Sequence, residues 1–94
     1  VTAVDAAGKV FRLANRGNYL DIAAPGVNVR HAVAGGGYGA SSGTSFAVPF
    51  AATAAAQLKF ASPGVNVREH LSKTAVDIGD PGRDDIFGYG LLTP

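Results

Sequence analysis

Hydrophobic residues form several short runs in the first third of the chain and one long stretch in its second half. Val1 to Ala6 and Val10 to Leu13 predict two short strands, because each run is brief, apolar and followed by turn residues. Tyr19 to Ala24 is apolar and stops at Pro25-Gly26, which favours a buried strand over a helix. The alternation in Val27 to Arg30 predicts a strand with one face in water.

One long helix is predicted over Ser45 to Ala61. Pro49 has no N–H and is tolerated only near a helix start, so the helix must begin within about one turn before it. This places Ser45 at the N-terminus of the helix. The alanine-rich body shows almost no polar face, and we expect it to be buried on most sides. Ala34 to Gly43 is rich in glycine and serine and is expected to be a loop.

A second, shorter helix is predicted after the break at Ser62-Pro63-Gly64. Asn66 is a candidate N-cap, and Glu69 follows it at the spacing of a capping box. One apolar stripe would run along this helix, formed by Val67, Leu71 and Ala75.

Composition narrows the class of protein. The 94 residues are 47% hydrophobic and 16% charged, which resembles the interior of a larger domain more than a complete small one. A net charge of +1 without a basic patch argues against nucleic-acid binding. The chain has no cysteine, which excludes disulfides and cysteine-bound zinc. The apolar stretches fall short of the about 20 residues that a membrane span needs.

Ser45 is the residue with the clearest catalytic chemistry. A helix N-terminus offers free backbone N–H groups and the positive end of the helix dipole. A serine hydroxyl becomes a nucleophile only beside a base, and the reaction also needs donors for the developing oxyanion. The Ser45 N–H is a candidate donor. The spacing alone equally fits a serine that simply stabilises the start of its helix.

The glycine-rich segment before Ser45 suggests other functional motifs. Gly39 to Gly43 matches the G-x-S-x-G pattern around Ser41, which would make Ser41 the nucleophile of an esterase-type hydrolase. That motif needs a strand directly before the serine and a helix directly after it, and the helical signal begins only after Thr44. The spacing of the glycines does not fit a phosphate-binding loop.

Four segments together resemble the subtilisin-like serine protease family in sequence, order and spacing. They are Asn15–Gly26 with its Asp-Ile-Ala-Ala-Pro-Gly end, Gly43–Pro49, Gly79–Asp84 and Phe87–Leu91. The resemblance implies an α/β fold, the subtilisin-like three-layer fold with a mostly parallel sheet flanked by helices. Residues 1–94 would be the C-terminal part of its catalytic domain. It also implies that Ser45 is the nucleophile and that Thr44, Ser42 and Ser41 contribute to the oxyanion site and the cleft lining.

The motifs of the family that carry the catalytic Asp, the catalytic His and the oxyanion Asn are absent from these 94 residues. His31 and His70 lack the setting of the family's histidine, and we interpret both as surface or structural residues. We therefore expect the chain alone to be inactive and the complete domain to cleave peptide or protein substrates. A non-catalytic scaffold or binding module derived from the same family is the alternative.

The resemblance also bears on partners, cofactors and location. It implies no cofactor and no metal in this chain, calcium in the complete enzyme, and a secreted or extracytoplasmic protein. Asp80, Asp84 and Asp85 are interpreted as solvated loop residues. The first strands and the alanine-rich helix would lack partners, so we expect association with the missing N-terminal part or self-association.

Overall fold

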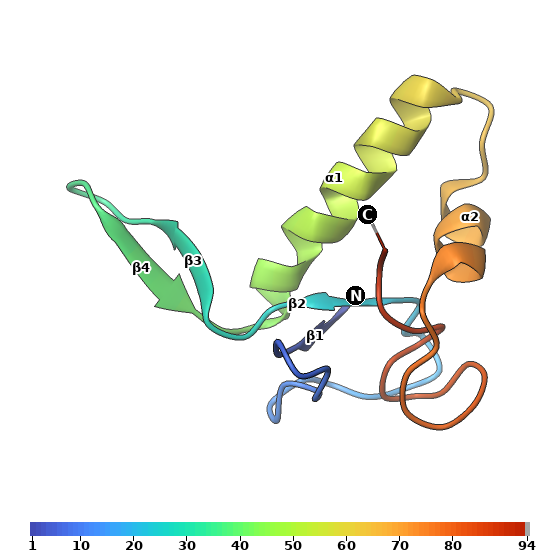
Figure 1. The fold of residues 1–94 in the computed structure, drawn as a ribbon, viewed down its shortest axis with the longest axis horizontal. Coiled ribbons are helices and arrows are strands. Elements are labelled where there is room, and N and C mark those ends of the chain that lie inside the picture. Colours follow the sequence, from blue (N-terminus) through green and yellow to red (C-terminus); the bar gives the residue numbers. More distant parts are fainter. Residues whose placement is uncertain (94) are drawn as a thin grey trace.

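The computed structural model describes residues 1–93 and shows two helices beside a narrow sheet (Figure 1). The elements are β1 (Thr2–Val4), β2 (Ala23–Pro25), β3 (Val29–Ala32), β4 (Tyr38–Ser41), α1 (Thr44–Ala61) and α2 (Val67–Thr74). α1 packs against β1, β2 and α2. The hairpin of β3 and β4 extends away from the other elements, on the side opposite α2. This arrangement confirms the α/β class.

The sheet is parallel at its centre. β1 and β2 pair in parallel with Ala3 opposite Ala24. Single contacts widen the sheet on both sides: Phe11 donates its N–H to the Ala3 carbonyl at 2.8 Å, and Ala23 forms a parallel bridge with Leu91. The widened sheet therefore brings the two ends of the described chain side by side around β2.

Small side chains form the core between α1 and the sheet. Ala3, Ala24 and Ala47 are completely buried against one another. Gly26 follows β2 and ties the sheet to the helix, because its N–H donates to the Val4 carbonyl and its own carbonyl accepts the Gly43 N–H at 2.8 Å. Residues this small let the helix approach the strands closely, so the start of α1 has a fixed position above the ends of β1 and β2.

Replacement of Gly26 by alanine is expected to lower the free energy of unfolding by about 1–3 kcal/mol. A Cβ at this position would overlap the Ala3 methyl group and lie 2.8 Å from the Gly43 carbonyl oxygen. Gly64→Ala is the matched control, because a Cβ there meets nothing within 4 Å. Urea unfolding of both variants measures the difference. A Gly26→Ala variant as stable as Gly64→Ala would contradict the close approach.

Both predicted helices are present, with their starts close to the expected positions. α1 begins at Thr44, one residue before the predicted start, and contains Pro49 in its second turn. Asn66 caps α2 as predicted, since its Oδ1 accepts the Glu69 N–H at 3.1 Å. The Glu69 carboxylate pairs with Lys73 at 2.7 Å instead of returning to the cap, so only half of the capping box forms.

The strand predictions hold only in part. Val10 to Leu13 is not a strand: Val10 forms a single bridge with Val4, and the Leu13 side chain is 67% exposed. The predicted strand 19–24 is reduced to Ala23–Pro25 and the strand 27–30 is displaced to Val29–Ala32. The pairing partners set these bounds, because a strand extends only where a neighbour offers hydrogen bonds.

The segment Ala34 to Gly43 is not the continuous loop that its composition predicts. Tyr38–Ser41 forms β4 and pairs antiparallel with β3, with Val29 opposite Ser41. The glycines at 35, 36 and 37 all have positive φ and turn the chain between the two strands. Glycine at position 39 lowers the strand propensity of β4, and the pairing with β3 overrides it.

The surface of α1 also differs from the prediction. Its buried residues are Ala47 and Ala51, whereas Phe50 and Phe60 are exposed, the latter to 92%. Within the described residues only one side of the helix meets the sheet and α2, which explains the open apolar face. No helix among residues 1–93 is long and apolar enough to cross a membrane.

Candidate active site

Ser45 is the second residue of α1 and is exposed at the start of the helix. No side chain caps this helix. The Phe46 N–H turns back to the Gly43 carbonyl at 3.0 Å, while the Ser45 N–H has no acceptor within residues 1–93. Ser45 thus combines an accessible hydroxyl with a free N–H at the positive end of a helix dipole.

Gly43 sets the direction in which the chain enters α1. Its φ of 150° and ψ of 162° lie in a region that is essentially restricted to glycine. Its N–H is held by the Gly26 carbonyl at 2.8 Å. The glycine before Thr44 and Ser45 is therefore required by the backbone, and the Gly26 contact fixes where the nucleophile candidate lies.

A hollow of about 300 Å³ opens beside Ser45. Thr44 and Gly43 form its helical side together with Ser45, and the opposite side comes from the loop after β1. That loop contributes Phe11, Leu13, Ala14, Asn15, Tyr19 and Leu20. The sequence pattern predicts a strand over Val10 to Leu13 in this loop and assigns none of its residues to the site, because no catalytic motif lies there. A substrate group placed against Ser45 would meet this loop.

The three hydroxyls grouped with Ser45 on sequence grounds lie in different places. Thr44 lines the hollow with Ser45, whereas Ser41 and Ser42 do not border it. The Ser42 Oγ accepts the Asn28 N–H at 2.9 Å and so supports the turn between β2 and β3. Asn28 has a positive φ of 53°, and this hydrogen bond helps to hold it there.

Neither histidine is hydrogen-bonded to Ser45 in the part of the chain that the structure describes. His31 stacks on the Phe46 ring with centroids 5.3 Å apart, and its Nε2 lies 2.6 Å from the Ser41 Oγ. His70 is exposed on α2. The base that would activate Ser45 is therefore not supplied by either residue.

Asp21 and Asp84 have structural partners. The Asp21 carboxylate pairs with the Arg68 guanidinium at 3.3 Å. Asp84 is a turn-forming residue, because its Oδ1 accepts the N–H groups of Ile86 and Phe87 at 2.9 and 2.7 Å. Across residues 1–93 no three carboxylates or histidines come together as a metal site would require.

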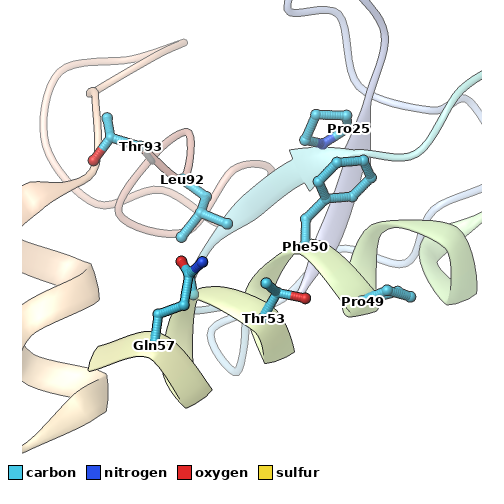
Figure 2. Close-up of a pocket in the computed structure, with 8 residues that line it drawn as sticks. Pro25, Pro49, Phe50, Thr53, Gln57, Leu92 and Thr93 are labelled. Carbon is cyan, nitrogen blue, oxygen red and sulfur yellow. The ribbon is translucent and has the colours of Figure 1, made fainter. Parts of the chain in front are cut away.

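An apolar groove lies away from Ser45, along α1 (Figure 2). It has a volume of about 590 Å³ and lies between the helix, the end of β2 and the residues after Leu91. Its lining consists of Pro25, Pro49, Phe50, Thr53, Ala54, Gln57, Leu92 and Thr93. None of these side chains is titratable, so the groove is an uncovered apolar face and not a site of acid–base chemistry.

The sequence is similar to a family of known proteins. Residues 1–90 match the model of the Subtilase family. The chain is 40% identical over 98 aligned residues to the minor extracellular protease Epr of Bacillus subtilis (strain 168), covering 98% of this chain and 15% of that protein. It is 42% identical over 95 residues to the halolysin-like extracellular serine protease Nep of Natrialba magadii, covering 98% and 17%.

A solved structure agrees with these matches. The patellamide maturation protease PatA aligns with a TM-score of 0.78 at 30% identity, over 98% of this chain and 38% of that one. The chain spans less than a fifth of the length of the two curated relatives and less than half of the solved one. The matches therefore cover nearly all of this chain but only a part of each relative.

Proposed function

Because the chain belongs to the subtilase family, we propose that it is the C-terminal part of a serine endopeptidase domain in which Ser45 is the nucleophile. The observation that carries this proposal is the position of Ser45, exposed at the uncapped start of α1 beside a hollow. The substrates would be peptides or proteins. The two curated relatives named above are extracellular proteases, and we place this protein outside the cytoplasm on that ground.

The chemistry would proceed through an acyl-enzyme. The Ser45 Oγ attacks the carbonyl carbon of the scissile bond, and its proton passes to a base and then to the leaving amine. The free Ser45 N–H faces the developing oxyanion. The helix dipole contributes roughly 0.3–1 kcal/mol there. A positioned donor contributes more, about 2.7–4 kcal/mol, a value that comes from subtilisin itself.

Around the nucleophile, Thr44 would line the cleft from the helix side, since it borders the same hollow. Ser41 and Ser42 would lie on the leaving-group side. The reaction at these residues would need no cofactor. Calcium would bind in the complete enzyme.

The base and the second oxyanion donor would come from the N-terminal part of the domain. That part would also cover the apolar groove along α1 and the exposed Phe50.

Without the N-terminal part of the domain, we expect the chain to associate with copies of itself, because an uncovered apolar face favours association. Sedimentation of the isolated chain checks this, and a stable monomer would count against it.

The isolated chain is expected to show no prompt reaction of Ser45 with a fluorophosphonate probe. A serine without its base and with half of its oxyanion donors keeps only a small residue of activity. Mass spectrometry with fragment-ion localisation checks the site, since the tryptic peptide 31–59 also contains Ser41 and Ser42. Addition of the N-terminal part of the domain should make Ser45 reactive.

Prompt modification of Ser45 in the isolated chain would show that the base lies within these residues. A complete protein whose Ser45 stays unmodified would instead favour the alternative, a non-catalytic scaffold or binding module.

A further inference from the structure

A second serine of this chain has a histidine against it. The register of the hairpin pairs Val29 with Ser41 and His31 with Gly39, so the side chains of His31 and Ser41 lie diagonally on the same face. The imidazole ring lies beside Gly39 across the hairpin, where a Cβ would be 3.7 Å from its Cε1. The two side chains meet with the His31 Nε2 2.6 Å from the Ser41 Oγ.

The backbone determines which ring nitrogen carries the proton. The His31 Nδ1 lies 2.9 Å from the Ala32 carbonyl oxygen, which can only accept a hydrogen bond. The Nδ1 therefore carries the hydrogen, and in the neutral imidazole the Nε2 is an acceptor. It follows that the Ser41 hydroxyl donates its proton to His31. This is the arrangement of a serine nucleophile with its general base and an orienting carbonyl.

Phe46 holds the imidazole from a third side. Its ring stacks on His31 at 5.3 Å between centroids, with an angle of 28° between the planes. Ser41 and His31 are both half-buried, so the pair is partly shielded but reachable. The neighbouring Ser42 and Ser45 are exposed and have no histidine against them within residues 1–93.

We propose that Ser41 is a second nucleophile of this protein, with His31 as its base, and that it is acylated by small carboxylic esters with a good leaving group. The Ser41 Oγ attacks the ester carbonyl carbon while its proton passes to the His31 Nε2. The bond from that carbon to the leaving oxygen then breaks, and the proton follows to the leaving group. The acyl group remains on Ser41 as an ester.

This reaction does not depend on Ser45 or on any residue outside the described chain. It also differs from the nucleophile elbow suggested by the G-x-S-x-G pattern. In that motif a helix follows the serine directly, whereas here α1 begins at Thr44. The pairing with His31, which the pattern does not contain, is what supports the reactivity of Ser41.

Reaction of the chain with p-nitrophenyl acetate tests the proposal. Acetylation of Ser41 is expected to be about 10²-fold faster than that of Ser42 or Ser45, because a positioned general base contributes a factor of about 10²–10⁴. Time-resolved mass spectrometry with fragment-ion localisation in the peptide 31–59 gives the three rates in one sample. Equal rates at the three serines would overturn the proposal, and this comparison needs no variant.

Two variants separate a catalytic pair from a merely accessible serine. His31→Phe keeps a ring against Phe46 but removes the base, and it should lower acetylation of Ser41 to the level of Ser42. Ser41→Ala should abolish the fast phase of p-nitrophenolate release. An unchanged rate at Ser41 in His31→Phe, or a fast phase that persists in Ser41→Ala because His31 itself reacts, would each contradict the proposal.

Discussion

Replacement of Ser45 by alanine in the complete protein is expected to lower kcat for peptide hydrolysis by about 10⁶-fold, a loss known from subtilisin, a member of the same family. The reason is that the hydroxyl exposed at the start of α1 forms the covalent intermediate, and no other group can replace it. Steady-state kinetics on a chromogenic peptide measures the change. A residual rate above the uncatalysed one should remain from the oxyanion donors and substrate binding.

Ser62→Ala is the matched control, because Ser62 is the C-cap at the far end of the same helix. It should leave kcat unchanged. Two results would contradict the role of Ser45: a Ser45→Ala variant that keeps its activity, or a Ser62→Ala variant that loses as much.

Replacement of Gly43 by alanine is expected to lower both stability and activity. The backbone at Gly43 lies in a region essentially restricted to glycine, and holding another residue there costs about 1–3 kcal/mol. Relief of this strain would move the start of α1 and with it Ser45. A displacement of about 1 Å at a reacting group can cost about 10²-fold in rate. Thermal unfolding and kcat/KM of the complete protein measure the two effects.

Gly36→Ala provides the comparison for this variant. Gly36 also has a positive φ, of 102°, with open space around it at the tip of the hairpin. It should lower stability by a similar amount without changing kcat. Equal kinetic losses in both variants would show that general destabilisation, and not the position of Ser45, explains the effect of Gly43→Ala.

The start of α1, which carries Ser45, was the most predictable part of the fold. Pro49 places the start of the helix about one turn before it, and the observed start at Thr44 is one residue earlier than the predicted Ser45. Four segments together, among them Asn15–Gly26 and Gly43–Pro49, identified the family, which the match over residues 1–90 confirms. Local rules sufficed here because the geometry depends on single residues with narrow conformational limits.

The features missed by sequence reasoning depend on pairing between distant residues. β4 was expected to be loop, and without its register nothing connects Ser41 with a histidine ten residues earlier. His31 was therefore interpreted as a surface or structural residue. The loop that faces Ser45 was missed for the same reason, since residues such as Asn15 reach the hollow only through the packing of β1 and β2.

The most direct test of Ser45 as the nucleophile is the site of fluorophosphonate modification in the complete protein. Digestion and fragment-ion analysis of the peptide 31–59 distinguish the three serines in it. We expect a stoichiometric adduct on Ser45, with its formation paralleling the loss of peptidase activity. Loss of activity with the adduct on Ser41 or Ser42, or with no adduct in this peptide, would contradict the account.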